Sequence, residues 1–255
     1  MLSTLDVQAL ETKVKDMYRL VAQEPQGNFH FEVGRRLALR LGYDASQLDR
    51  VPSQAVDSFA GVGHFFDLAD LRHGERVVDL GSGSGMDAFY AAALVGPSGQ
   101  VTGIDFTAEQ LEKARRLADD TGTSHVEFCE GRIEQLPLPD ADVDSVISNG
   151  VINLVPDKQQ VFAEAARVLR PGGRLAIADI VTEIPLTEAI VCNVDLWASC
   201  IGGAPQEESY LAAIDAAGLV IREVRTNPYE FLSDQARGAS RRYGVKSISL
   251  LATKP

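Results

Sequence analysis

A stretch rich in small residues, VVDLGSGSGMDAFYAAA at residues 77–93, has the composition of a cofactor-binding turn. An apolar strand leads into three glycines at alternate positions, and small and apolar residues at helical spacing follow. A strand, a glycine turn and a helix open many nucleotide-binding α/β folds. The turn could hold a pyrophosphate, or it could let the backbone approach another part of a nucleoside cofactor.

The spacing of the glycines separates these two kinds of cofactor. Dinucleotide turns place glycines at positions 1, 3 and 6, whereas here the glycines are Gly81, Gly83 and Gly85. Met86 stands at position 6, where a side chain hinders the close approach of helix and strand in a dinucleotide turn. Asp79 would repel a pyrophosphate and would favour an ammonium group, or the water that such a group holds.

A second acidic residue ends the next predicted strand, which reads Gly103-Ile104-Asp105-Phe106. At the carboxyl end of a strand beside the glycine turn, the Asp105 carboxylate can accept hydrogen bonds from both ribose hydroxyls. Either kind of nucleoside cofactor could use this residue, so the discrimination rests on Asp79 and Met86.

From residue 74 onward, strands and helices alternate, which indicates parallel pairing through right-handed crossovers. The fold class is therefore α/β and Rossmann-like, with a mostly parallel sheet covered by helices on both faces. We expect a capping box at Thr107 and Gln110 and a turn at 170–173. The predicted strands are 76–80, 100–105, 126–129, 143–148, 174–180, 219–226 and 245–252, and the predicted helices are 86–95, 108–119, 158–169, 206–216 and 229–242.

The ends of this alternating region suggest two further units. Apolar positions at helical spacing predict helices over 5–22 and 29–42, so residues 1–73 form an N-terminal helical cap and residues 74–255 the main domain. The segment 181–204 departs from the strand–helix rhythm, and we expect it to cover the substrate. Both units should lie at the carboxyl ends of the strands, where such folds bind ligands.

Composition narrows the partners to small molecules. The net charge is −12 and the sequence has no long Lys/Arg cluster, so a nucleic-acid partner is not expected. We also expect no membrane span, no signal peptide and, with three cysteines, no disulfide framework, which places the protein in the cytoplasm. The histidines show no metal-ligand spacing, so no metal is expected. Oligomeric state is not indicated.

Four ordered motifs together resemble class I S-adenosylmethionine-dependent methyltransferases: residues 77–85, 103–105, 131–134 and 170–173. The resemblance implies a seven-stranded sheet and S-adenosylmethionine as cofactor. It implies that Asp105 binds the ribose, that Phe106 packs on the adenine, and that Ile133 borders the adenine edge. The implied cofactor-binding residues are Tyr18, Asp79, Gly81, Ser82, Gly83, Gly85, Asp105, Phe106, Arg132, Ile133, Glu134, Asn149, Gly150 and Val151.

Three more stretches resemble arsenite methyltransferases: AGVGH at 60–64, ISNGVINLVPD at 147–157 and DLWASCIGGA at 195–204. These enzymes hold trivalent arsenic through cysteine thiolates, which suit a soft centre. The three family positions read Val62, Gly150 and Cys200 here, so matching residues cannot build a three-thiolate cage. Cys129 is expected in an interior strand, and Cys192 lies two helical turns before Cys200, so that both could share a helix face.

The substrate-binding candidates are Cys200, Trp197 and His64, the last a potential general base. No catalytic residue is assigned. The first hypothesis is methyl transfer to arsenite or a related soft acceptor. The second is O-, N-, S- or C-methylation of an organic small molecule on the same scaffold. The third is a different class, a nicotinamide oxidoreductase or a non-catalytic binder of the cofactor.

Overall fold

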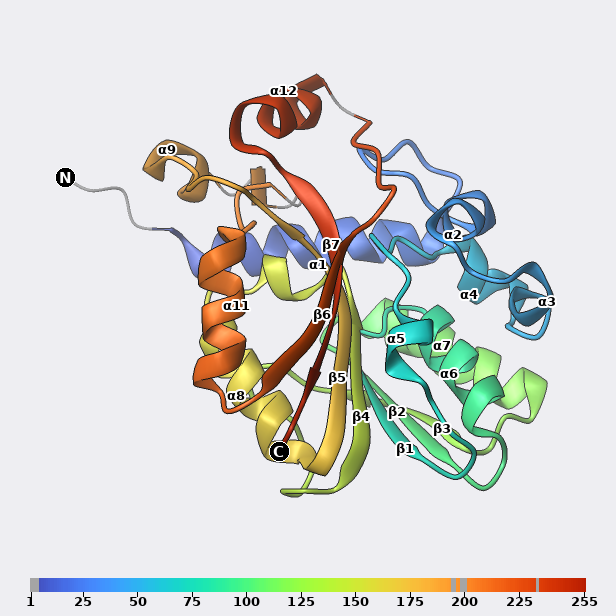
Figure 1. The fold of residues 1–255 in the computed structure, drawn as a ribbon. Helices are drawn as coiled ribbons and strands as arrows, with labels where there is room; N and C mark the ends of the chain where they lie inside the picture. Colours follow the sequence, from blue (N-terminus) through green and yellow to red (C-terminus); the bar gives the residue numbers. More distant parts are fainter. Residues whose placement is uncertain (1–4, 194–195, 198–200, 233) are drawn as a thin grey trace.

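The computed structural model describes residues 5–193, 196–197, 201–232 and 234–255. Within these residues the chain forms a sheet of seven strands in the order β3-β2-β1-β4-β5-β7-β6 (Figure 1). Only β7 runs antiparallel to its neighbours, so the prediction of a mostly parallel sheet is confirmed. The strands are β1 Arg76–Leu80, β2 Gln100–Asp105, β3 Val126–Glu130, β4 Val143–Asn149, β5 Leu169–Val181, β6 Val220–Thr226 and β7 Lys246–Thr253.

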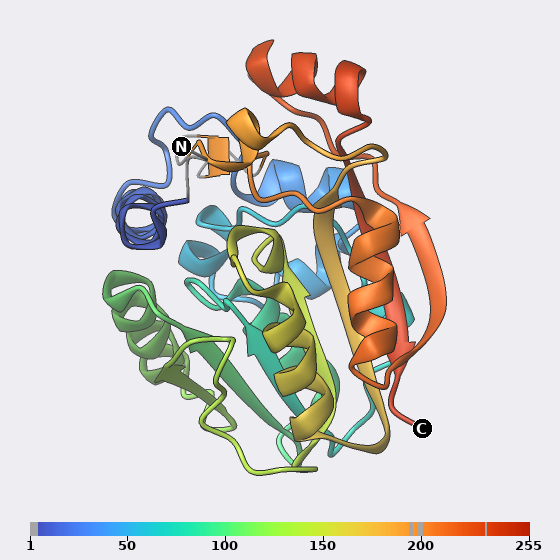
Figure 2. The ribbon, with the colours of Figure 1, turned by 90° about the vertical axis from the view of Figure 1, so that its left-hand side faces the viewer.

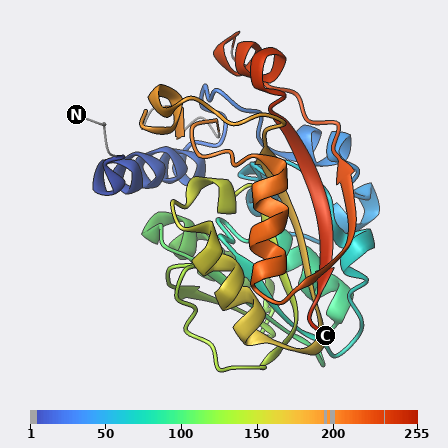
Figure 3. The same cartoon turned by 60° about the vertical axis from the view of Figure 1, so that its left-hand side comes forward.

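Helices cover both faces of the sheet, as predicted. Figure 3 shows α8 (Lys158–Val168) and α11 (Glu207–Ala216) side by side on one face. The other face carries α5 (Phe66–Ala69), α6 (Met86–Val95) and α7 (Ala108–Thr121). The two faces bury separate apolar clusters, because successive strand residues point to opposite sides. In β1, for example, Val77 belongs to one cluster and Val78 to the other, and both are buried.

The N-terminal helices lie at the carboxyl ends of the parallel strands. The helix α1 (Val7–Gln23) begins at Asp6, whose carboxylate accepts a hydrogen bond from the Ala9 amide at 3.0 Å. It crosses above the strand ends and buries one apolar stripe against the body (Figures 1 and 2). The short helices that follow are α2 Arg35–Leu41, α3 Ala45–Leu48 and α4 Ser53–Asp57.

Two predicted helices are shorter than expected. The helix over 29–42 begins only at Arg35, because Gly34 adopts φ 88° and its amide donates to Phe59 O at 2.8 Å. The residues before it are non-helical, and the rings of Phe29 and Phe31 stack there at 5.6 Å. The helix over 229–242 begins at Asp234 as α12 (Asp234–Tyr243).

Two local predictions are wrong in detail. Thr107 begins α7 without a side-chain cap, because Gln110 turns instead to Ser84 and to the carbonyl of Tyr18. The segment 170–173 belongs to β5 as an irregular stretch, where the pairing with β4 shifts register between Val143 and Ser145. Within the described residues, no helix combines the length and hydrophobicity needed to span a bilayer.

Candidate functional site

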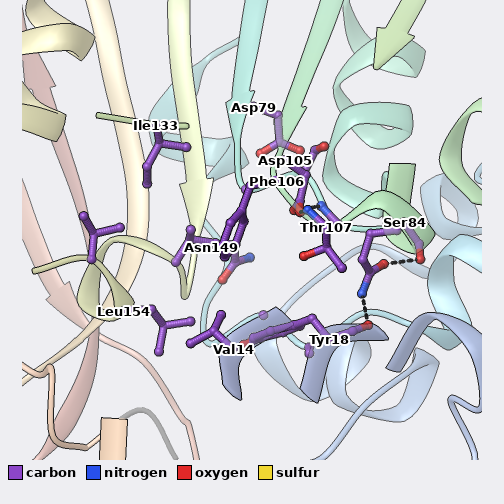
Figure 4. Close-up of a pocket in the computed structure, with 18 of the residues that line it drawn as sticks. Val14, Tyr18, Asp79, Ser84, Asp105, Phe106, Thr107, Ile133, Asn149 and Leu154 are labelled. Atoms are coloured by element: carbon purple, nitrogen blue, oxygen red, sulfur yellow. Dashed lines mark hydrogen bonds between the residues drawn. The ribbon is translucent and has the colours of Figure 1, made fainter. Parts of the chain in front are cut away.

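A pocket opens at the carboxyl ends of β1, β2 and β4, between the glycine turn and α1 (Figure 4). Most of the residues predicted to bind a cofactor meet there, although they come from five separate segments. The predicted residues in its lining are Tyr18, Asp79, Gly81, Ser82, Gly83, Asp105, Phe106, Arg132, Ile133, Glu134, Asn149 and Val151.

The glycine turn folds tightly over the end of the neighbouring strand. The amides of Gly81 and Ser82 both donate to Ile104 O, at 2.7 and 3.0 Å. Gly81 adopts φ 71°, and a Cβ there would lie 2.5 Å from the methyl groups of Val151. Glycine is therefore required at this position both by the backbone conformation and by the space. The turn presents backbone rather than side chains to the pocket.

Two buried carboxylates lie at one end of the pocket. Asp79, only 2% exposed, has a carboxylate oxygen with no hydrogen-bond partner among the described residues. Burial raises the pKa of Asp79 well above its usual range, and the neighbouring carboxylates of Asp87 and Asp105 raise it further. Burial likewise raises the pKa of Asp87 to about 6. A cation placed beside Asp79 would offset this cost and satisfy its unpaired oxygen.

Asn149 links the carboxylates to the wall of the pocket. Its amide nitrogen donates to Asp87 Oδ2 and to the Tyr43 hydroxyl, both at 3.0 Å. The Tyr43 hydroxyl in turn donates to Asp87 Oδ1 at 2.6 Å. The Asn149 amide oxygen accepts from the backbone amides of Val62 and Gly63. One side chain thus joins the end of β4, the start of α6 and the segment 62–63.

The part of the pocket around Asp105, next to Asp79, suits a nucleoside (Figure 4). Asp105 Oδ2 accepts from the Gly83 amide at 2.9 Å and Oδ1 from the Thr107 amide at 2.8 Å. The Thr107 hydroxyl and the Phe106 amide add to these bonds, so the carboxylate is held in place beside the glycine turn although burial raises its pKa. Phe106 and Ile133 supply apolar surface beside it (Figure 4). The Lys15 ammonium lies 4.9 Å from the Phe106 ring centroid, on the side of α1.

Arg132 and Glu134 lie at the rim and hold α1. Arg132 makes a two-pronged contact with Glu11 of α1 and a longer one, 3.5 Å, with Glu134. The Glu11 contact holds the pKa of that carboxyl below its usual value. The contact between Arg132 and Glu11 therefore holds α1 against the rim of the pocket.

Two predicted cofactor residues lie outside the lining. Gly85 adopts φ 90°, and a Cβ there would lie 2.6 Å from the Phe128 ring, so this glycine permits α6 to pack against β3. It supplies the close helix–strand contact that the third glycine of a dinucleotide turn provides. Gly150 adopts φ 70° and lies against Val62, whose Cγ1 would be 3.1 Å from an added Cβ.

None of the described substrate candidates faces the pocket. The His64 ring packs edge-on against Tyr43 and lies 3.3 Å from Asp67, and burial lowers the pKa of the imidazole. The ring of Trp197 is buried beneath the Lys158 ammonium, 5.0 Å from the ring centroid. Cys200 lies outside the described residues.

The other two cysteines do not complete a thiolate set. Cys129 is half-buried on β3, at the sheet edge away from β4. The helix α9 (Glu188–Val191) ends before Cys192, and residues 192–193 are non-helical, so the helix expected to carry Cys192 is interrupted there. The described residues contain no cluster of three or more metal-ligating side chains.

Several lining residues were missed by the sequence analysis. Asp87 is the most consequential, and its signal was an acidic residue near the start of an otherwise apolar helix. Most of the others have no local signal of a pocket position, because only the fold brings them to the strand ends. Ala60 and Gly61 belong to the AGVGH stretch quoted above, but they were not assigned to the pocket. The further lining residues are Leu10, Glu11, Val14, Ala55, Ser58, Phe59, Ala60, Gly61, Ser84, Met86, Thr107, Gln110, Gly131, Leu154, Val155 and Pro156.

Comparison with known proteins agrees with this geometry. A family model described as a methyltransferase domain matches residues 71–218, more than half of the chain. The chain belongs to the methyltransferase family. Its likeness extends to a solved arsenic(III) S-adenosylmethionine methyltransferase from Chlamydomonas reinhardtii, with 34% identity and a TM-score of 0.70. The alignment covers 82% of this chain and 71% of that one.

Two curated arsenite methyltransferases are also similar. The one from Halobacterium salinarum is 40% identical over 218 residues, which is 85% of this chain and 56% of that protein. The one from Homo sapiens is 46% identical over 137 residues, which is 50% of this chain and 36% of that protein. The chain thus spans between about a third and somewhat more than half of the length of these relatives. The family cofactor is S-adenosylmethionine, and the pocket fits it through Asp79, the glycine turn and Asp105.

Proposed function

We propose that this chain is an S-adenosylmethionine-dependent methyltransferase that acts on arsenite or a related soft small-molecule acceptor. The observation that carries the proposal is the unpartnered oxygen of Asp79, buried beside a glycine turn whose backbone lies open to the pocket. An amino-acid-bearing nucleoside places an ammonium there, whereas a dinucleotide would place a phosphate. The similarity to arsenite methyltransferases supports the acceptor class.

In this proposal the lining residues bind three parts of the cofactor. Asp79, supported by Asp87, receives the ammonium of the methionine part, and Asp105 receives the ribose hydroxyls. Phe106 and Ile133 contact the adenine. The cofactor supplies an electrophilic methyl group on a sulfonium. The helix α1 and the apolar lining exclude water from that group.

The chain contributes mainly alignment to the reaction. The acceptor must reach the methyl carbon opposite the departing sulfur, and a fixed approach accounts for much of the rate of such a displacement. A nucleophile with a free lone pair, such as trivalent arsenic, needs no general base. This agrees with a site in which His64 is packed behind the wall instead of facing the pocket.

A second candidate, methylation of a small organic acceptor, is favoured by Val62 and Gly150. Both stand at positions where the resemblance implies thiolate ligands, and they pack directly against each other. Because Gly150 adopts φ 70°, a cysteine there would be strained unless the backbone shifted. An apolar wall in place of two thiolates suits an organic acceptor better than a bare arsenic centre.

The organisation of the chain is part of the proposal. Residues 1–73 act as the helical cap and residues 74–255 as the methyltransferase domain. The segment 181–204 would cover the acceptor. Its described part approaches the domain through Gly203, where a Cβ would lie 2.1 Å from Asn153 O.

The test is incubation of the chain with arsenite, glutathione and methyl-labelled cofactor. We expect labelled methylarsenic, and a Cys200→Ser variant should lose most of it if the remaining thiol binds arsenic. A chain that binds the cofactor but forms no methylated arsenic would contradict the first candidate and leave the organic acceptor. A chain that does not bind the cofactor at all would contradict the proposal as a whole.

A further inference from the structure

The segment 59–64, called the wall below, borders the pocket beside Asn149: residues 59–61 belong to the lining, and residues 62–64 continue from them outside it. Phe59, Ala60 and Gly61 line the pocket. Val62, 1% exposed, follows them and packs against Gly150. If the methionine part binds at Asp79, this wall lies beside the transferred methyl group, so the inference below rests on the proposed function.

Side chains from distant strands hold the backbone of this wall. Val62 O accepts a hydrogen bond from Ser247 Oγ at 2.6 Å, and His64 O accepts one from Ser249 Oγ at 2.8 Å. Both serines lie on β7 and are buried, with 2% and 0% exposure. On the cofactor side, Asn149 binds the amides of residues 62 and 63. The wall is thus fixed from two sides by polar side chains.

The wall has little room to move. A Cβ on Gly63 would lie 2.1 Å from Asn227 Nδ2 and 2.7 Å from the Cβ of Ala178. Asn227 is itself fixed, because its amide nitrogen donates to Ser247 Oγ at 2.9 Å and its amide oxygen lies 2.9 Å from Ser249 Oγ, whose one hydrogen it shares with His64 O. A buried strand face ordinarily carries apolar side chains, whereas here two hydroxyls at i and i+2 point at the wall.

We propose that Ser247 is a positioning residue for the methyl acceptor: through its bond to Val62 O it fixes the wall against which the acceptor is aligned. Ser247 lies outside the cofactor lining, unlike Asn149, so its removal changes the wall without removing a cofactor contact. Ser249 performs the same role two residues further along, at His64 O. Acceptor alignment thus depends on β7, which pairs antiparallel with β5 and β6, although β7 does not line the pocket.

Two variants test this inference as a matched pair. Ser247→Ala removes the hydroxyl and leaves Val62 O unsatisfied in a buried site. Ser145→Ala is the control, because Ser145 is equally buried on β4 and its hydroxyl has no partner among the described residues. Exchange of the residue 62–64 amides is measured by mass spectrometry with S-adenosylhomocysteine bound. The KM for arsenite and the Kd for S-adenosylhomocysteine are measured on the same samples.

We expect Ser247→Ala to exchange these amides about tenfold faster and to raise the arsenite KM about fivefold to tenfold, with the Kd changed less than about twofold. Ser145→Ala should match the wild type in amide exchange, in the arsenite KM and in the Kd for S-adenosylhomocysteine. Unchanged exchange, or faster exchange with an unchanged KM, would overturn the inference. If Ser247→Ala does not fold, Ser249→Ala takes its place. Wild-type protein that binds S-adenosylhomocysteine but does not methylate arsenite counts against the proposed acceptor, while the exchange result still decides whether Ser247 holds the wall.

Discussion

At the scale of single residues, the site is defined by negative charge that is buried before any ligand binds. Asp79 and Asp87 lie beside each other in the pocket floor, and burial raises the pKa of both carboxyls. Tyr43 and Asn149 stabilise the ionised form of Asp87 by hydrogen bonding, but nothing described offsets the charge of the pair. Burying these carboxylates without a cation lowers the free energy of unfolding, and a cation bound beside them would offset that loss.

Cofactor affinity should therefore depend on pH. Because the pKa of Asp87 is about 6, the carboxylate is protonated at about pH 5 and ionised at about pH 7.5, and only the ionised form attracts an ammonium. We expect S-adenosylhomocysteine to bind more tightly at about pH 7.5 than at about pH 5. At the lower pH, binding should release a proton from the Asp87 carboxyl. Calorimetry in two buffers of different ionisation enthalpy measures both quantities, and an affinity equal at the two pH values would contradict this reading.

The stability of the ligand-free protein should show the opposite pH dependence. The pKa of Asp87 is raised from about 3.9 in the unfolded chain to about 6 in the folded one. The folded state thus holds this proton more tightly, and its contribution to the free energy of unfolding is lost as the pH rises from about 4 to about 6. An Asp87→Asn variant should weaken, without abolishing, the pH dependence of the urea-denaturation midpoint across that range, because burial also raises the pKa of Asp179 to about 6. A variant as pH-dependent as the wild type would exclude Asp87 as the cause.

Residue roles were predictable from sequence only where a local pattern marked them. Asp79 and Asp105 end predicted strands, so their meeting at one edge followed from the fold class. Tyr43 and Asp87 are 44 positions apart, and their hydrogen bond joins the cap to α6 without any local signal. His64 was considered as a base from its residue type and its place in the AGVGH stretch, and its ring is instead packed against Tyr43.

At the scale of elements, the glycine turn offers a controlled comparison. Gly81 and Gly122 have similar φ angles, 71° and 64°, but a Cβ would meet Val151 at position 81 and nothing within 4 Å at position 122. Gly122→Ala should lose about 1 kcal/mol of unfolding free energy from backbone strain. Gly81→Ala should lose more and bind S-adenosylhomocysteine at least about tenfold more weakly. Equal losses in the two variants, measured by urea denaturation and calorimetry, would mean that contact with Val151 is unimportant.

The helix α1 should act as a latch over the cofactor. The contact of Glu11 with Arg132 crosses the rim of the pocket, and both side chains are partly exposed. Because such ion pairs contribute about 0.2–1 kcal/mol, Glu11→Ala should speed S-adenosylhomocysteine release by about twofold to fivefold in stopped flow. Asp16→Ala breaks the exposed Asp16–Arg19 pair on the same helix, away from the rim, and should leave release unchanged. Equal rates in the two variants would show that α1 is held by its apolar face alone.

The elements from residue 74 to residue 180 were predictable because each buried strand is a short apolar run bounded by polar or glycine residues. The elements of the N-terminal region were less predictable from the sequence. The helix predicted from residue 29 begins only at Arg35, because the Gly34 amide donates to Phe59 O, while the rings of Phe29 and Phe31 stack in the non-helical segment before it. Gln110 fits a capping box, but its tertiary partners on α1 and the glycine turn replace that local bond. At Gly34 and at Gln110, a contact distant in sequence replaced a local preference.

At the scale of the whole molecule, the parallel part of the sheet lines the pocket that we propose for the cofactor, and the antiparallel part holds residues 62–64, which we propose to align the acceptor. The first group of strands ends in Asp79, Asp105 and Asn149, all in the pocket lining. The second carries Ser247 and Ser249, which hold residues 62–64 from behind. The same scaffold could therefore keep its cofactor while its acceptor changes, which fits an arsenite-type chain with Val62 and Gly150 in place of thiols.

The central claim is that the pocket takes an amino-acid-bearing nucleoside rather than a phosphate-linked one. Titration calorimetry of the chain with S-adenosylhomocysteine and, separately, with NADH tests it directly. The account predicts saturable binding of S-adenosylhomocysteine that Asp105→Ala weakens by at least about tenfold, because charge-assisted hydrogen bonds to the ribose are lost. It predicts no detectable binding of NADH. Saturable NADH binding without S-adenosylhomocysteine binding would contradict it.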